Sequence, residues 1–315
     1  MNGLELTRRY AIEVVLPALE RAAGSLMPSL AVGSVGDGSD RFGFDDEVSR
    51  DHDWGVALCI WMPDGEPETV REVRTVLEGL PKTYRGWPVL GTGASCPAGR
   101  AGVFTVGEHY YRFCGMPGGP RSADEWDAVP EYALAAATNG AVFWDGPGAF
   151  SAVRERLLAG YPEPVRLKRI AERCLAFAQA GQANLVRAVL RGDRVGSRVA
   201  YARMHEAACL LAHALSRRFC PYYKWQQASC AEWCGTLGEE VALVLEYLAA
   251  PEGPVELMDA VGTQRVVDAI AAALLEELSA QGLACGQSLF LLDHVDYIRS
   301  LVKDRELLAR PSPQN

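Results

Sequence analysis

The chain has 315 residues, and its 31 Lys and Arg against 40 Asp and Glu give a formal net charge of −9. This acidic balance disfavours a protein whose main task is to bind duplex nucleic acid. No apolar run reaches the roughly 20 residues that span a bilayer, so we expect no membrane partner.

The first residues lack the basic start, apolar middle and small-residue cleavage site of a signal peptide, and we therefore expect a cytoplasmic protein. The nine cysteines agree with that expectation if they are reduced, because free cysteine behaves as a small buried hydrophobe. The length is sufficient for two domains.

The N-terminal half mixes helical and strand patterns, which is typical of a sheet domain with flanking helices. We place this domain at residues 1–160 and predict an α+β fold with a mixed β-sheet. Helices are expected at residues 4–23, 68–80, 126–138 and 150–158, and strands at residues 30–32, 53–61, 103–106, 109–113 and 141–144.

The character of the sequence changes at residue 162, where strand patterns end. Apolar residues then recur at i, i+3 and i+4 along several long segments. This periodicity predicts an α-helical bundle domain at residues 161–308. Residues 309–315 are rich in Pro and Ser, and we expect a disordered tail there.

The residues between the first two expected strands combine two motifs. Gly33 and Ser34 directly follow an apolar run. Glycine allows the backbone to approach a phosphate closely, and a serine hydroxyl adds a donor. Asp51 and Asp53 precede the next strand, where residues i and i+2 share a face. Paired carboxylates suit Mg²⁺, which binds one or two of them together with substrate phosphates.

This order of motifs resembles the DNA polymerase β-type nucleotidyltransferase superfamily, whose signature is Gly-Ser at the start of a short helix and Asp-x-Asp on the next strand. The gap from Ser34 to Asp51 is longer than is usual there. Over residues 30–225 the chain resembles a largely uncharacterised bacterial branch with a C-terminal helical domain. The segments that carry this second resemblance are residues 43–46, 49–55, 142–146, 191–193 and 222–225.

The resemblance implies that Gly33 and Ser34 bind the phosphates of a nucleotide such as ATP. It also implies that Asp51 and Asp53 are catalytic and hold two Mg²⁺ ions. The superfamily often uses a third carboxylate from a later strand as ligand or general base. Glu108, between two expected strands, and Asp145, at the end of a third, are the candidates.

Other charged residues leave alternatives open. Asp45 and Asp46 form a second carboxylate pair, but neighbours in a strand point to opposite faces, so they could instead cap a turn, bind the acceptor or support the ligands. Lys224, one of four lysines, could reach a phosphate as a point charge. It could equally extend from a buried aromatic corner into solvent.

A zinc site formed by Cys220, Cys230 and Cys234 is disfavoured, because their spacing is not C-x-x-C and no histidine lies near them in the sequence.

The function that these residues predict is Mg²⁺-dependent transfer of NMP from an NTP to a hydroxyl, with pyrophosphate as the leaving group. The sheet-plus-bundle plan looks similar to antibiotic nucleotidyltransferases, which favours a small-molecule acceptor over a protein hydroxyl or an RNA end. The alternative is a catalytically degenerate relative that acts as a binding or antitoxin-like regulatory protein.

Overall fold

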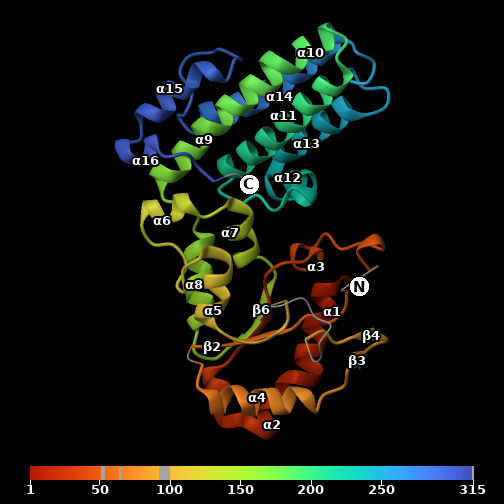
Figure 1. The fold of residues 1–315 in the computed structure, drawn as a ribbon, viewed down its shortest axis with the longest axis vertical. Helices are drawn as coiled ribbons and strands as arrows, with labels where there is room; N and C mark the ends of the chain where they lie inside the picture. Colours follow the sequence, from red (N-terminus) through yellow and green to blue (C-terminus); the bar gives the residue numbers. More distant parts are fainter. Residues whose placement is uncertain (51–53, 64, 92–99, 314–315) are drawn as a thin grey trace. The chain divides into compact units, whose positions relative to one another are not determined.

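The computed structural model describes residues 1–50, 54–63, 65–91 and 100–313. The chain forms two compact units (Figure 1). Unit 1 comprises Met1–Pro120 and Ala133–Ala159, and unit 2 comprises Arg121–Tyr132 and Gly160–Asn315. The sheet lies in unit 1, whereas the described residues of unit 2 form helices and their connections. The predicted α+β fold class is therefore confirmed.

Unit 1 is built on a four-stranded mixed sheet with strand order β5-β2-β1-β6. β1 is antiparallel to both of its neighbours, and β2 is parallel to β5. The strands, including the separate β3–β4 hairpin, are β1 (Ala31–Ser34), β2 (Cys59–Met62), β3 (Thr83–Tyr84), β4 (Trp87–Pro88), β5 (Gly102–Thr105) and β6 (Ala141–Asp145).

Both faces of this sheet are buried because side chains alternate along each strand. Val32 and Ile60 share one face and pack with Leu19 of α2. Trp61 points to the other face, where its ring stacks on Phe150 of α8 with centroids 3.9 Å apart.

The helices in or entering unit 1 are α1 (Gly3–Tyr10), α2 (Leu16–Ala23), α3 (Ser39–Phe42), α4 (Pro67–Glu78), α5 (Val106–Cys114), α7 (Glu131–Thr138) and α8 (Ala149–Leu158), with a π-helical turn at Ala11–Val15 and 3₁₀ segments at Gly24–Ser29 and Val48–Arg50.

One expected strand is wrong, because residues 109–113 belong to helix α5. The backbone N–H of Glu108 donates to Thr105 Oγ1 at 2.9 Å, and the Glu108 carboxylate accepts from the Thr105 N–H at 2.6 Å. This reciprocal capping box starts a helix. His109 and Tyr110 are then buried on its inner side. The capping box therefore makes this segment helical, although its amino-acid composition is typical of a strand.

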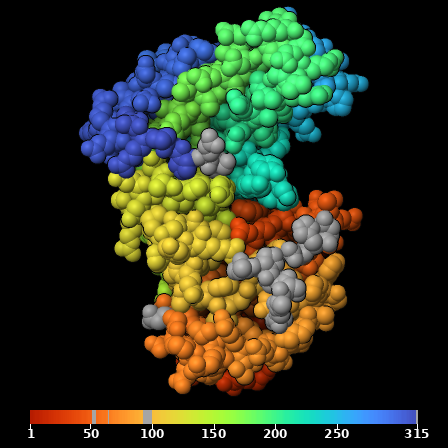
Figure 2. Space-filling view, viewed as in Figure 1, coloured from red at the N-terminus to blue at the C-terminus, as the bar shows by residue number. Residues whose placement is uncertain are grey.

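Unit 2 is an α-helical bundle in which α15 packs along α9, and Figure 2 shows the blue C-terminal residues directly against the green helices. None of the described helices is both long and apolar enough to cross a membrane. The remaining helices are α6 (Ala123–Ala128), α9 (Glu163–Phe177), α10 (Val186–Leu190), α11 (Arg194–Leu215), α12 (Gln226–Trp233), α13 (Gly235–Ala249), α14 (Ala260–Ala280), α15 (Leu292–Ser300) and α16 (Arg305–Ala309), with a π-helical segment at Ala178–Leu185 and a 3₁₀ turn at Tyr223–Trp225.

The segment Arg121–Tyr132 belongs to unit 2, although the sequence places it in the first domain. Its carboxylates are the partners of buried cations on α9. Lys168 Nζ donates to Asp127 Oδ2 at 2.6 Å, and the Arg173 guanidinium pairs with Glu131. A buried charge without a partner is strongly destabilising, so these two pairs fix the segment to α9.

The end of the chain also contacts this segment. Arg310 lies 2.8 Å from the Asp124 carboxylate, and Ser312 Oγ donates to Asp127 Oδ1 at 3.2 Å. These contacts involve residues of the expected disordered tail, 309–315, and its disorder stays a prediction.

Candidate functional site

A glycine-rich turn follows β1 at one end of the sheet. Gly36 and Gly38 have φ angles of +128° and +132°, which other residues rarely adopt. Asn139 holds the turn in place, since its amide accepts from the Gly36 N–H at 2.9 Å and donates to the Gly36 carbonyl at 2.7 Å. The same end of the sheet receives the chain that enters β2, because β1 and β2 are antiparallel.

Asp51 and Asp53, the predicted metal ligands, lie outside the described residues, and their role stays a prediction. The residues on either side of them are linked, since Trp54 Nε1 donates to Asp45 Oδ2 at 3.0 Å. Further along, Ser34 Oγ donates to the Ala57 carbonyl at 2.8 Å. The chain on both sides of the aspartates is therefore attached at the end of β1 where the turn begins.

Gly33 and Ser34 do not lie in the predicted phosphate-binding position. Both are buried within β1. A Cβ on Gly33 would stand 2.6 Å from the Ala141 carbonyl oxygen, so glycine allows β6 to approach β1 closely. The Ser34 hydroxyl also accepts from Arg41 Nε at 3.0 Å. The two residues hold the sheet together, and a fully buried hydroxyl with two partners does not reach a phosphate.

Gly38 and Ser39 form the Gly-Ser pair that begins a short helix, α3. That is the position which the superfamily signature requires. Ser39 precedes Asp51 by 12 residues instead of the 17 that separate Ser34 from Asp51, so the unusually long gap disappears. The second Gly-Ser in the turn was the sequence signal that could have identified this pair.

The turn presents free backbone donors. No described residue accepts a hydrogen bond from the backbone N–H of Asp37, Gly38 or Ser39. Consecutive backbone N–H groups in a glycine-rich turn form a concave anion site. A Cβ on Gly38 would lie 2.3 Å from Asp40 Oδ1, so a side chain there would disturb this arrangement.

A buried arginine, Arg41, lies beside the turn. Arg41 is 2% exposed and donates to the carbonyls of Asp37 at 2.5 Å and Ala57 at 3.3 Å. It also donates to the carbonyl of Arg100. No carboxylate within the described part of the chain forms an ion pair with it. The positive charge of the guanidinium is thus available to attract an anion bound in the turn.

Two further arginines are paired with acids of the turn. Arg112 Nη2 lies 2.7 Å from Asp37 Oδ2, and Arg100 Nη2 lies 3.1 Å from Asp40 Oδ1. Each of these pairs is neutral overall, so neither arginine adds a net charge beside Arg41. Sequence reasoning missed these arginines and Asn139, since their partners are far away in the chain.

Two carboxylate oxygens near the turn are buried and lack a hydrogen-bond partner among the described residues: Asp40 Oδ2 and Asp45 Oδ1. Both carboxylates flank Gly3, whose N–H donates to Asp45 Oδ2 at 2.8 Å and whose Cβ, if present, would touch the Asp40 side chain. A buried unpaired carboxylate oxygen is costly unless a donor or a cation satisfies it. Hard oxygen ligands of this kind fit Mg²⁺.

Asp46 caps the next turn, which is one of the three roles left open by the sequence. Its Oδ1 accepts from the Ser49 N–H at 2.8 Å and from the Ser49 hydroxyl at 2.9 Å. The backbone hydrogen bond from Ser49 is the main cause that lowers the pKa of the Asp46 carboxyl. This carboxylate is exposed and engaged in local structure.

Glu108 and Asp145, the candidates for a third carboxylate, lie at the opposite end of the sheet. Asp145 pairs with Ala31, three residues or about 10 Å along β1 from Ser34. Its Oδ2 accepts from the Ser151 N–H at 2.7 Å. Glu108 follows the far end of β5 and completes the capping box of α5. The directions of the strands therefore place Glu108 and Asp145 away from the turn, which does not fit the predicted role of a third carboxylate beside it.

Lys224 belongs to unit 2, where it is exposed on the 3₁₀ turn. The rings of Tyr222 and Tyr223 lie 4.3 Å apart beside it. The two tyrosines are 47% and 61% exposed, so the segment is an exposed aromatic group and not the buried corner of the alternative interpretation. A contact between Lys224 and phosphate stays a prediction.

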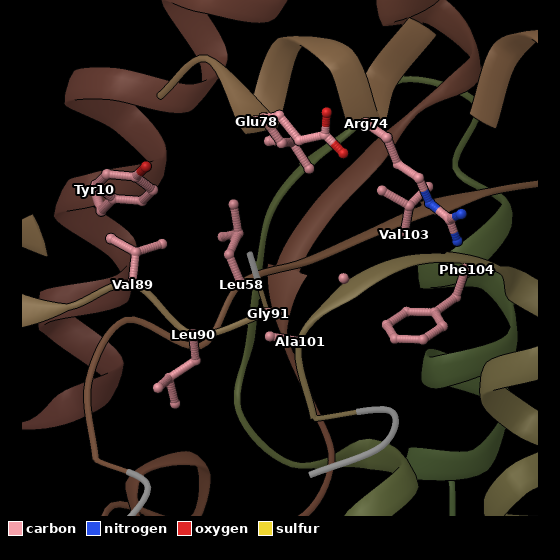
Figure 3. A pocket seen from close by; sticks show the side chains of 12 residues that line it. Tyr10, Leu58, Arg74, Glu78, Val89, Leu90, Gly91, Ala101, Val103 and Phe104 are labelled. Carbon is pink, nitrogen blue, oxygen red and sulfur yellow. The ribbon is translucent and has the colours of Figure 1, made fainter. Parts of the chain in front are cut away.

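Unit 1 also contains a pocket of about 340 Å³. Figure 3 shows Arg74 and Glu78 of α4 above a mainly apolar lining. None of the described lining residues belongs to the turn, so this pocket is separate from the candidate site. Its apolar lining includes Tyr10, Leu58, Val89, Leu90, Val103 and Phe104.

Comparisons with known proteins give two matches. A family model described as a domain of unknown function (DUF4037) matches residues 126–226, about a third of the chain. No protein with curated function matches. The crystal structure of a nucleotidyltransferase-like protein from Exiguobacterium sibiricum is similar with a TM-score of 0.34 and 11% identity, over 90% of this chain and 87% of that one. Neither match assigns a role to a residue of the turn.

Proposed function

We propose that this protein is a nucleotidyltransferase whose turn at residues 36–39 binds the phosphates of an NTP. The observation that carries the proposal is that the N–H groups of Asp37, Gly38 and Ser39 have no acceptor among the described residues and lie beside the positively charged Arg41. Donors and a buried cation at one place favour a polyanion. The Asp-x-Asp motif, 12 residues after Ser39, supplies the acids that this chemistry needs.

In this proposal the residues of the turn position the substrate. The N–H groups donate to phosphate oxygens, and Arg41 offsets their charge without touching solvent. Asp51 and Asp53 would hold Mg²⁺, with the unpaired oxygens of Asp40 and Asp45 close to the chain that leads into them. When bound, the ions would neutralise the triphosphate and lower the pKa of the acceptor hydroxyl.

The acceptor in this proposal is the hydroxyl of a small molecule. A hydroxyl of a protein or of RNA is the alternative acceptor, and a screen of all three classes decides between them.

The first test measures nucleotide binding. The full chain is melted with and without each NTP in the presence of Mg²⁺ or EDTA. We expect a rise in melting temperature only with nucleotide and Mg²⁺ together, because a ligand that binds the folded state alone stabilises it. The double variant Asp51→Asn, Asp53→Asn should lose this response, whereas Glu20→Gln, an exposed acid on α2, should keep it.

The second test measures turnover with labelled NTPs and panels of hydroxyl acceptors, by release of pyrophosphate. Binding together with turnover that requires Asp51 and Asp53 supports the enzyme. Binding without any product across the panels would favour the degenerate, regulatory alternative. Absence of both binding and turnover would contradict the nucleotide site itself.

A further inference from the structure

Four side chains that commonly bind metals converge inside unit 2. Cys209 and His213 stand one turn apart on α11, and Cys230 and Cys234 stand one turn apart at the end of α12. The ligand atoms of His213, Cys230 and Cys234 all lie within 4.8 Å of one another. Residues at i and i+4 share one face of a helix, so the packing of two helices brings two such pairs together.

The cluster is sealed from solvent. Cys209, Cys230 and His213 are 0% exposed, and Cys234 is 5% exposed. The three ligand atoms that lie together are those of His213, Cys230 and Cys234. The thiol of Cys230 lies 3.8 Å from the Gly238 carbonyl oxygen, and the thiol of Cys209, beside this group, lies 3.8 Å from His205 Nε2.

The hydrogen bonds of His213 identify the ring nitrogen that donates. Its Nδ1 lies 2.7 Å from the Cys209 carbonyl oxygen, a contact that requires a proton on Nδ1. In the neutral ring, Nε2 is then the nitrogen with a lone pair that can bind a metal. Histidines that bind metals typically donate their other N–H to a backbone carbonyl in this way, which orients the ring and strengthens the ligand.

Nε2 of His213 shares its neighbour Ser229 with a backbone carbonyl. Ser229 Oγ lies 3.0 Å from Nε2 and 3.1 Å from the Gln226 carbonyl, but a hydroxyl has one proton to share between these two acceptors. A cation beside Nε2 would remove this competition, because the hydroxyl could then donate to the Gln226 carbonyl alone.

We propose that His213, Cys230 and Cys234, with Cys209 as the fourth ligand, bind a structural zinc ion that joins α11 to the end of α12. One nitrogen and three sulfur ligands form one of the usual structural zinc sites. Tetrahedral zinc places sulfur atoms about 3.8 Å apart and nitrogen about 3.5 Å from sulfur. The ligand atoms of His213, Cys230 and Cys234, within 4.8 Å of one another, therefore require only small shifts. Each thiol releases its proton to solvent as the Zn–S bond forms.

This site is independent of the proposed nucleotide site, since all its residues belong to unit 2 and the turn belongs to unit 1. The sequence disfavours zinc because no histidine is near Cys230. The structure brings His213 from 17 residues upstream by packing α11 against α12.

The metal content of the full chain, purified without chelators, is the direct test. We expect about one zinc per chain by elemental analysis and its release when the thiols are modified. Co²⁺ incorporated in place of zinc should give the intense visible bands of a tetrahedral site and sulfur-to-cobalt charge transfer in the near ultraviolet. Zinc at background level in the folded wild-type protein, with no such bands after exposure to Co²⁺, would overturn the proposal.

Variants then identify the ligands. Cys230→Ser with Cys234→Ser should lose the metal, whereas Cys174→Ser, a buried thiol on α9, should keep it. Cys209→Ser should reduce the charge-transfer intensity by about a third, because one of three thiolates is lost. An unchanged intensity would overturn the assignment of Cys209. If the serine variants fold poorly, stoichiometric zinc release from wild-type protein still decides the main claim.

Discussion

At the scale of single residues, Gly38 has the most restricted position in the candidate site. Its φ of +132° lies in a region that L-residues rarely adopt, and a Cβ would also stand 3.1 Å from Arg100 Nη2. Gly43, at the other end of α3, has a φ of +82° but an open position with nothing within 4 Å. A side chain at Gly43 would therefore introduce backbone strain alone, whereas a side chain at Gly38 would introduce both backbone strain and a steric clash.

We expect Gly38→Ala to destabilise the protein by about 2–3 kcal/mol and to abolish stabilisation by NTP and Mg²⁺. Gly43→Ala should cost about 1 kcal/mol and leave the nucleotide response intact. Urea unfolding followed by melting with nucleotide measures both effects. Equal loss of the nucleotide response in the two variants would argue against the turn as the phosphate site.

The buried residue His109 should make the stability of the protein depend on pH. Burial among Trp61, Tyr110 and Phe150 is the main cause that lowers its pKa to about 3, and Arg41 and Arg112 add to this effect. Its Nε2 has no hydrogen-bond partner in the described part of the chain. Because an unfolded histidine has a pKa near 6.5, the unfolded state binds the proton first as the pH falls.

The stability of the folded state should therefore decrease as the pH falls from 6.5 towards 3, by about 2 kcal/mol at pH 5 from this group. His109→Phe keeps an aromatic ring in the core and should remove that part of the pH dependence. Chemical denaturation at pH 7.5 and pH 5 measures the difference. An identical pH dependence in the variant and the wild type would show that His109 does not contribute.

At the scale of elements, strand direction decides which carboxylates can act together. β1 and β2 run in opposite directions, so the turn and the chain that enters β2 meet at one end. β5 runs parallel to β2, and β6 antiparallel to β1, which sends Glu108 and Asp145 to the other end. The two acids stabilise the starts of α5 and α8.

We expect Asp145→Asn and Glu108→Gln to leave nucleotide binding and turnover unchanged. Each should destabilise the protein by less than about 1 kcal/mol, because Asn and Gln keep a side-chain oxygen that accepts the same backbone hydrogen bond. Thr105→Ala removes the acceptor of the other half of the capping box and should cost about 1 kcal/mol. A large loss of activity in Asp145→Asn, without a change in stability, would return this residue to the candidate site.

At the scale of the whole molecule, the chain contributes to unit 2 twice. Residues 121–132 leave unit 1, supply Asp127 and Glu131 to α9, and are followed by residues 133–159, which belong to unit 1 again. Lys168 and Arg173 are buried and depend on these carboxylates. A cut at residue 160 therefore separates two buried cations from their partners.

We expect a fragment of residues 160–315 to be several kcal/mol less stable than one of residues 121–315, because two buried ion pairs are broken. Circular dichroism during thermal unfolding compares the two fragments. Lys168→Met with Arg173→Met in the shorter fragment should recover part of the loss, since apolar side chains need no counterion. Equal stability of the two unsubstituted fragments would contradict this account.

The sequence by itself determined the elements with strong local patterns. Alternation and apolar runs located β1 and β6, and the helical period located α4 and the bundle of unit 2. It also located the glycine-rich turn, whereas the role of the acidic pair stays a prediction. Local patterns are sufficient here because they depend on neighbours a few residues apart.

Only the tertiary structure decided which residues meet. Gly33 and Ser34 match a phosphate motif locally, but their burial between strands leaves Gly38 and Ser39 at the helix start. His213 reaches the cysteines through helix packing. These contacts join positions that are far apart in the chain, and the burial, strand direction and charge partners that select them exist only after the chain has folded.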